Sequence, residues 1–215
     1  MFKRIALFMA LNLVVMLTLG TLAYAFGLTG GTGKNLDLTK VFGFSLVFGF
    51  GGAFISLLLS KPLAKWSVGA KTIDPQTSSG RWLYNVVESQ AQRSGIAMPE
   101  VCVYDSEEPN AFATGAFKNS ALVAVSTGLL NKLSKEEVEA VLGHEIGHVA
   151  NGDMVTMTLL QGVLNTFVIF IAKIVGWAVD RIVLKNEDEA PGIAQIAVTL
   201  IMEVLLGIAA SIVLA

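Results

Sequence analysis

Two histidines and a glutamate occupy one short stretch of the chain, in the pattern His144-Glu145-x-x-His148. In an α-helix, residues four apart lie about 40° apart around the axis and about one turn apart in height, so both imidazoles can reach one metal ion. A glutamate between them is placed to act as a general base on metal-bound water. Zinc would lower the pKa of that water toward about 7 and polarise a carbonyl, which is the chemistry of peptide hydrolysis without a covalent intermediate.

The segment from Ser134 to Gly152 carries the signals of one helix. Ser134 and Glu137 make a capping box at its start, and Gly152 offers a stop at its end. On a helical wheel, Glu145 falls within a stripe of apolar residues. The stripe consists of Val138, Val141, Leu142, Ile146 and Val149. The sequence therefore predicts a helix with a carboxylate on its inward face.

The histidine pattern has less specific interpretations. It occurs by chance, and two surface histidines beside a helix salt-bridge partner, or a metal site without catalysis, would produce it too. The chain contains only two histidines, and both belong to the pattern. This context favours a catalytic zinc site with His144 and His148 as ligands and Glu145 as the base. We expect no other cofactor.

A catalytic zinc ion normally has three protein ligands, and the histidine pattern supplies two of them. A histidine ten residues after the first is excluded, because Met154 stands there. Cys102, Glu203 and the acidic cluster Glu187-Asp188-Glu189 remain as candidates. We expect Cys102 to be a buried apolar residue, Glu203 to pair within a helix bundle and the cluster to be a solvated loop. None of them is preferred as the ligand.

The composition indicates a membrane protein. Hydrophobic residues make up 53% of the 215 residues and charged residues only 15%, which is more apolar surface than one soluble domain buries. The net charge is −2 and no basic run is longer than Lys3-Arg4, so a nucleic-acid partner is not expected. The single cysteine excludes an internal disulfide, which is consistent with a reducing compartment for the soluble part.

Four apolar stretches are long enough to cross about 30 Å of hydrocarbon. They are Ile5 to Phe26, Val41 to Leu59, Met157 to Val179 and Ile193 to Ala215. The first is longer than a signal-peptide core and a second span follows it, so we interpret it as retained. Lys61, Lys65 and Lys71 predict a cytoplasmic location for the N-terminus and for the chain from residue 61 onward, although Lys34 and Lys40 in the outer loop weaken this bias.

Mixed helix and strand signals lie between the second and third spans. Arg81 to Ser94 has apolar residues at helical spacing and predicts a helix. Val101 to Tyr104 and Ala121 to Val125 are short apolar runs typical of strands. We interpret Asp105 to Asn119, between them, as a loop.

These signals predict an α-helical membrane protein with four transmembrane helices and a small α+β soluble domain. Residues 1–60 hold two spans and a short outer loop, residues 61–156 form the cytoplasmic domain, and residues 157–215 form a transmembrane hairpin. The histidine pattern lies at the end of the soluble domain, just before the hairpin.

Three segments carry a family resemblance. They are Asn110 to Gly115, the run ALVAVSTG from Ala121 to Gly128, and AVLGHEIGHVANGDMVTMTL from Ala140 to Leu159. Together they resemble the bacterial HtpX membrane metalloproteases, relatives of the eukaryotic CAAX prenyl endoproteases, and the similarity extends over essentially the whole chain. In that family the first segment leads to a substrate-binding edge strand of a zincin-like domain.

The resemblance implies a zinc-dependent endopeptidase of the bacterial cytoplasmic (inner) membrane, multi-pass and with its active site facing the cytoplasm. Its implied substrates are misfolded membrane proteins, which such enzymes degrade in quality control and stress response. By position, His144 and His148 correspond to the zinc ligands and Glu145 to the catalytic base. Asn151 and Asp153 lie where supporting groups would stand.

The chain departs from the family pattern at the third zinc ligand. That ligand is a glutamate in an E-x-x-A-D pattern after the final membrane hairpin, and the pattern occurs nowhere in this sequence. The expectation is a fragment that holds zinc weakly and is inactive as it stands. A different class also remains open, namely a non-catalytic, membrane-anchored module that binds partners, and metal content distinguishes the two.

Overall fold

The computed structural model describes residues 19, 32 and 34–214. Apart from Leu19, the first predicted span, Ile5 to Phe26, lies outside the described residues. The chain divides into two compact units, one of residues Met1–Ile55 with Met157–Ala215 and the other of residues Ser56–Thr156. The first unit holds most of each long apolar helix, and the second holds the sheet.

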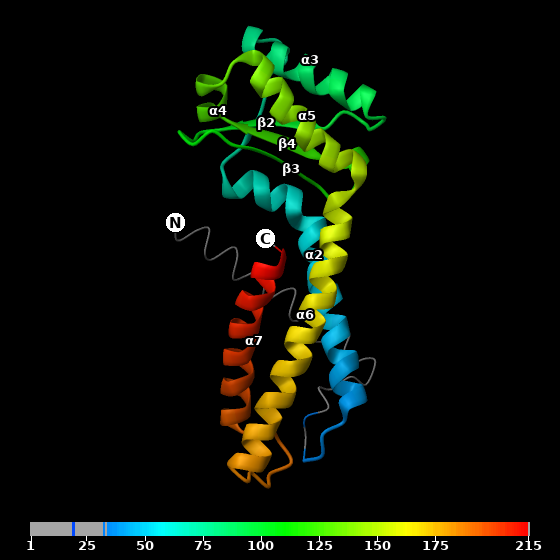
Figure 1. Ribbon diagram of the computed structural model, residues 1–215, viewed down its shortest axis with the longest axis vertical. Helices are drawn as coiled ribbons and strands as arrows, with labels where there is room; N and C mark the ends of the chain where they lie inside the picture. The colour runs from blue at the N-terminus through cyan, green and yellow to red at the C-terminus, as the bar shows by residue number, and fades with distance from the viewer. Residues whose placement is uncertain (1–18, 20–31, 33, 215) are drawn as a thin grey trace. The chain divides into compact units, whose positions relative to one another are not determined.

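Three helices of the described part are long and apolar enough to cross a membrane. They are α2 (Leu38–Ser67), α6 (Asp153–Ala178, followed by a π-helical turn at Val179–Val183) and α7 (Ile193–Leu214). Figure 1 shows them as the extended rods of the ribbon. They correspond to the second, third and fourth predicted spans.

Small residues let these helices approach closely. A side chain at Gly49 of α2 would collide with Thr166 of α6, and one at Gly176 of α6 would collide with Thr199 of α7. In lipid there is no hydrophobic driving force between helices, so close backbone approach at small residues is a main source of packing energy. These two glycines therefore fix how α6 packs against its neighbours.

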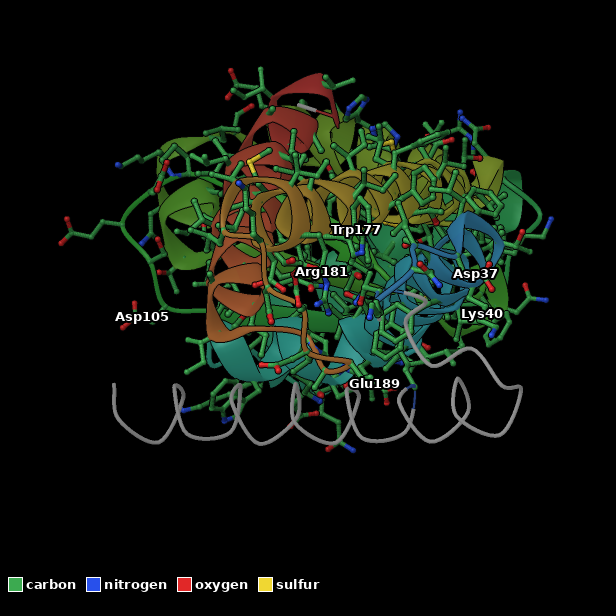
Figure 2. The ribbon with its side chains drawn as sticks, turned by 90° about the horizontal axis from the view of Figure 1, so that it is seen from below. Asp37, Lys40, Asp105, Trp177, Arg181 and Glu189 are labelled. Atoms are coloured by element: carbon green, nitrogen blue, oxygen red, sulfur yellow. The ribbon has the colours of Figure 1, made fainter. Side chains whose placement is uncertain are left out.

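Asp180 and Arg181 hold the segment that joins α6 to α7. The buried Asp180 carboxylate accepts hydrogen bonds from the Asn186 amide at 3.0 Å and from the Gly192 backbone at 3.2 Å. The Arg181 guanidinium donates to three backbone carbonyls of the segment, and Figure 2 shows it inside the curve of the chain. The side chains of Glu187-Asp188-Glu189 are exposed, as predicted.

The second unit is built on a four-stranded mixed sheet. Its strands are β1 (Lys71–Thr72), β2 (Glu100–Tyr104), β3 (Ala111–Thr114) and β4 (Leu122–Ser126), in the order β1-β2-β4-β3. β2 and β4 are parallel, and β1 and β3 are antiparallel edge strands. The two predicted strands are confirmed as β2 and β4. The interpretation of Asp105 to Asn119 as a loop is wrong, because β3 lies within it.

Helices α3 (Ser78–Arg93) and α5 (Lys135–Asn151) cover one face of this sheet, and the short α4 (Thr127–Lys132) follows β4 (Figure 1). The core lies between the helices and the sheet. Its fully buried residues include Val87, Val123, Val125, Leu142 and Ile146. The predicted helix at Arg81 to Ser94 is confirmed as α3, which begins three residues earlier because Thr77 caps it by accepting a hydrogen bond from the Gly80 N–H.

Within the second unit, ion pairs join the last turns of α2, which belong to this unit, to the sheet. The Glu100 carboxylate on β2 contacts the ammonium of Lys65 at 2.5 Å and that of Lys61 at 3.1 Å. The Thr72 hydroxyl on β1 donates to the same carboxylate at 2.8 Å. These contacts stabilise α2 beyond Leu59, where we predicted the span to end. The Lys65 ammonium, followed by the Thr72 hydroxyl, lowers the pKa of Glu100 to about 2.

This network predicts a pH dependence of stability. The folded-state pKa of Glu100, about 2, lies below its ordinary value of 4.5, so the stabilisation is complete above that ordinary value and is lost as the pH falls toward 2. We expect Glu100→Gln to lower the free energy of unfolding by at most about 1 kcal/mol at pH 7, since the groups are partly exposed. Denaturant unfolding in detergent micelles should show this difference shrinking below pH 4.5. A difference that persists unchanged to pH 2 would contradict the assignment.

Candidate catalytic site

Helix α5 carries all three candidate catalytic residues, and local interactions fix both of its ends. The Ser134 hydroxyl accepts a hydrogen bond from the Glu137 N–H at 3.3 Å, and the Glu137 carboxylate accepts one from the Ser134 N–H at 2.8 Å. The helix ends at Gly152, whose φ of 76° lies in the left-handed region that glycine adopts without strain. The prediction of one helix from Ser134 to Gly152 is confirmed.

Buried side chains fix the rotation of α5 about its axis. Leu142 and Ile146 are 0% exposed in the core beneath the helix. His144, by contrast, is exposed and His148 is half-buried. Turning the histidines away would expose the apolar stripe, at a cost of about 1.5–3 kcal/mol for each large residue. The core therefore holds both imidazoles on the open side of α5.

The two imidazole rings face each other through their Nε2 atoms. These atoms are 3.0 Å apart, and the ring centroids are 4.5 Å apart with an interplanar angle of 79°. Two nitrogen ligands at about 2.0–2.1 Å from a tetrahedral zinc ion stand roughly 3.3 Å apart. The donor set and its spacing therefore fit a zinc ion bound by both Nε2 atoms.

Asp153 contacts the other nitrogen of the second imidazole. Its carboxylate lies 2.6 Å from His148 Nδ1, so that nitrogen donates when it carries the proton and Nε2 stays available to a metal. Asp153 is the first residue of α6, separated from α5 only by Gly152. The Asn151 side chain is exposed, and neither hydrogen bond of the His148 ring reaches it. Of the two supporting residues considered from the sequence, only Asp153 reaches a histidine.

The half-buried Glu145 carboxylate contacts the edge of the sheet. Its Oε2 accepts a hydrogen bond from the Ala113 N–H of β3 at 3.1 Å. Because β3 is an edge strand, this N–H is free to donate away from β4. The contact explains how a carboxylate is accommodated within the apolar stripe of α5, and it places the open strand edge beside Glu145. Sequence reasoning from strand propensity missed β3, and only the family resemblance suggested it.

No third metal-binding group joins the histidine pair among residues 34–214. Within this described part, no three His, Cys, Asp or Glu side chains come together closely enough to hold an ion. Cys102 is 0% exposed in a small core with Leu122 and Ala124, and burial raises the pKa of its thiol. Its predicted role as a buried apolar residue is confirmed. Glu203 belongs to α7 in the other unit.

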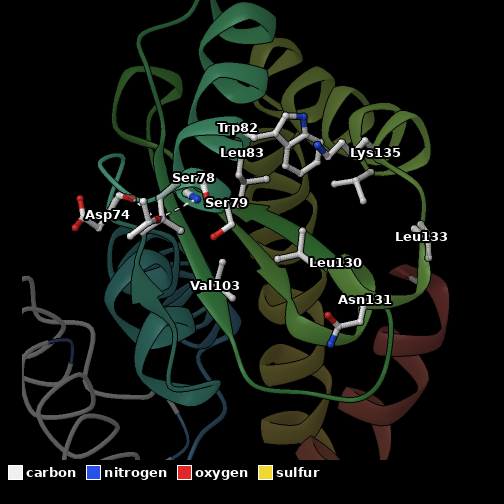
Figure 3. A pocket seen from close by; sticks show the side chains of 14 residues that line it. Asp74, Ser78, Ser79, Trp82, Leu83, Val103, Leu130, Asn131, Leu133 and Lys135 are labelled. Carbon is white, nitrogen blue, oxygen red and sulfur yellow. Dashed lines mark hydrogen bonds between the residues drawn. The ribbon is translucent and has the colours of Figure 1, made fainter.

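A cavity of about 680 Å³ lies beside the first turns of α3 and α5 (Figure 3). Trp82 and Lys135 stand on its wall, with the ammonium 5.5 Å from the centroid of the indole ring. His144, Glu145 and His148 do not line it. The cavity is therefore separate from the candidate catalytic site.

Comparisons with known proteins point to one family. The profile of peptidase family M48 matches residues 77–215. The HtpX protease homologue of Leptothrix cholodnii is 57% identical over 99% of this chain, which spans 74% of that protein. The HtpX protease of Hydrogenovibrio crunogenus is 55% identical over 97% of this chain and 71% of its own length.

A solved structure shares the fold. The crystal structure of Ste24p from S. mikatae superimposes with a TM-score of 0.57 over 96% of this chain and 50% of that one. At 20% sequence identity this likeness concerns the fold alone.

Proposed function

Since the chain belongs to peptidase family M48, as a homologue of the HtpX proteases, we propose that it is a zinc-dependent endopeptidase embedded in the membrane. The observation that carries the proposal is the pair of Nε2 atoms 3.0 Å apart, with Glu145 between the two histidines on the same helix. A helical pair of imidazoles with an intervening carboxylate is the arrangement of metallopeptidases that activate water.

In the proposed mechanism, His144 and His148 would hold zinc through their Nε2 atoms. When bound, the metal supplies a Lewis acid for the scissile carbonyl and lowers the pKa of the attacking water. The Glu145 carboxylate accepts the proton of that water and delivers it to the leaving amine. The Ala113 N–H holds one oxygen of this carboxylate at 3.1 Å, which restricts its rotation. The Asp153 carboxylate contacts His148 Nδ1 and would so keep Nε2 available to a bound metal.

Removing and restoring zinc tests the proposal. With excess zinc to offset a weak site, the chain in detergent micelles should hydrolyse an unfolded or membrane-protein substrate, and a chelator should stop the hydrolysis. Bound zinc without hydrolysis would agree with the expectation that the chain is inactive as it stands. Catalytic zinc sites normally use three protein ligands, whereas only two imidazoles converge among the described residues. Zinc should therefore be bound weakly, and we expect dialysis against a mild chelator to remove it. His144→Ala should not be rescued by zinc. A chain that binds no zinc even when the metal is in excess would favour the non-catalytic binding module instead.

We also propose the topology and substrates that the resemblance implies. Residues 1–60 would hold two spans, residues 61–156 a cytoplasmic catalytic domain and residues 157–215 a hairpin in the bacterial inner membrane, four spans in all. Misfolded membrane proteins would be the substrates, degraded in quality control. Support comes from the three long apolar helices, from Lys61 and Lys65 in the last turns of α2 and from Lys71 just after it.

Cysteine labelling in spheroplasts tests the orientation. In a Cys102→Ala background, a cysteine at Asn35 should react with an impermeant thiol reagent from outside. A cysteine at Ser106 should react only after the membrane is permeabilised, because residues 61–156 are expected in the cytoplasm. The reverse pattern would show that the soluble unit faces the other side.

A further inference from the structure

A second polar site lies among the apolar helices, within the unit of residues 1–55 and 157–215. A cavity of about 300 Å³ is lined by α2, α6 and α7. Lys173 of α6 and Glu203 of α7 both stand on its wall. Charged residues inside apolar spans are costly in lipid, and they commonly mark a functional site. The proposed peptidase chemistry uses neither residue.

The packing of the hairpin sets these two side chains opposite each other. Asp180 holds Gly192 at the turn, and Gly176 meets Thr199 closer to the middle of the helices. Lys173 and Glu203 follow one turn further along the two helices. Lys173 therefore lies about 10 Å along α6 from Asp180, well inside the apolar stretch.

The wall of this cavity has hydrogen-bond acceptors that lack donors. Gln195 is 4% exposed and its amide nitrogen donates to the Thr32 carbonyl at 3.5 Å, but its Oε1 has no donor within the described part of the chain. The Glu203 carboxylate forms no ion pair within 4.0 Å with any residue of that part. The Lys173 ammonium lies 4.2 Å from the centroid of the Phe44 ring, a cation–π contact.

The cavity borders the outer surface of α7. Ile196 and Leu200 line it and are 54% and 57% exposed. On an apolar helix, such a surface faces lipid or another helix. The space accommodates a side chain rather than a whole helix, so an occupant from the membrane would insert a single polar group.

We propose that this cavity binds the amide side chain of an asparagine or glutamine in another membrane-embedded helix. The amide N–H groups would donate to Glu203 and to Gln195 Oε1, and the amide carbonyl would accept from Lys173. Unassembled membrane proteins expose polar side chains that would otherwise contact their partner helices, and in lipid such groups seek hydrogen bonds. If the chain is the peptidase proposed above, on which this inference rests, then membrane helices with an unpaired Asn or Gln side chain are its preferred substrates.

Photo-crosslinking tests the binding without requiring hydrolysis or zinc. The chain carries p-benzoylphenylalanine in place of Leu200 and is reconstituted with a leucine-rich transmembrane peptide that has one central Asn or, as the control, Leu. We expect crosslinking of the Asn peptide to exceed that of the Leu peptide about threefold or more. The same probe at Ile208, which is 56% exposed but does not line the cavity, should give equal yields.

Two variants separate the cavity from general helix association. Glu203→Leu should abolish the preference for Asn and leave the yield with the Leu peptide unchanged, whereas Val204→Leu should preserve the preference. Equal yields for the two peptides in the unmodified chain would overturn the inference. So would crosslinks that map to the chain's own Ile5 to Phe26 segment in place of the peptide. Loss of hydrolysis with the preference intact would refute only the proposed peptidase function.

Discussion

Glu145→Gln is expected to lower peptide hydrolysis about a thousandfold or more while zinc binding is retained. Glutamine keeps the shape of the side chain, and its carbonyl oxygen can still accept the hydrogen bond that Ala113 donates at 3.1 Å. It cannot accept the proton of the attacking water, and general base catalysis contributes about 10²–10⁴-fold in such reactions. The substitution therefore separates the chemistry from the metal site and the fold.

The rate should be measured with excess zinc, and bound metal should be determined in the same samples. Glu139→Gln is a matched control, because Glu139 is exposed on the same helix. It should retain the full rate. If the Glu145 variant keeps a rate within tenfold of the unmodified chain, the general-base assignment is wrong.

Asp153→Ala is expected to weaken zinc binding by about 10- to 100-fold. Groups that hydrogen-bond to metal-binding histidines typically have effects of this size, because they fix the tautomer and the orientation of the ring. The carboxylate lies 2.6 Å from His148 Nδ1, so its removal leaves the imidazole free to rotate. Asp153→Asn keeps an oxygen that can accept from Nδ1 and should recover part of the affinity.

Competition with a metallochromic chelator measures this affinity directly. Asn151→Ala removes a polar side chain from the same helix end without touching a histidine, and it should leave the affinity unchanged. A purely structural role of Asp153 would make the Asn and Ala variants equally weak. Unchanged zinc affinity in the Ala variant would show that Asp153 does not position His148.

The helix that carries the histidines could be predicted because its signals are local. The capping box of Ser134 with Glu137, the apolar stripe and the Gly152 stop all lie within one segment, and the structure places the helix where they indicate. The apolar helices were predictable for the same reason, since length and hydropathy are properties of a single stretch.

Contacts between distant segments could not be predicted in this way. β3 has only four residues, Ala111–Thr114, and becomes a strand because β4 pairs with it. The parallel pairing of β2 with β4 likewise depends on a crossover between them. The hydrogen bond from Ala113 to Glu145 joins residues 32 positions apart, and no periodicity in the sequence reports it.

The contact between Asp153 and His148 is an intermediate case. The two residues are only five positions apart, but they belong to different helices. Helical periodicity alone would place them on different faces, about 140° apart. The family resemblance pointed to Asp153 by its position, together with Asn151, and only the structure distinguishes the two.

Only Gly152 separates α5 from α6, so the geometry at His148 depends on the number of residues between the two helices as well as on their identity. One inserted residue between α5 and α6 would turn the start of α6 by about 100° and advance it by about 1.5 Å. The contact between the Asp153 carboxylate and His148 Nδ1 would then be lost, although no side chain of either helix had been changed. Insertions and deletions here should therefore be tolerated far less well than in the exposed segment around Glu187, where the chain can lengthen without moving a histidine.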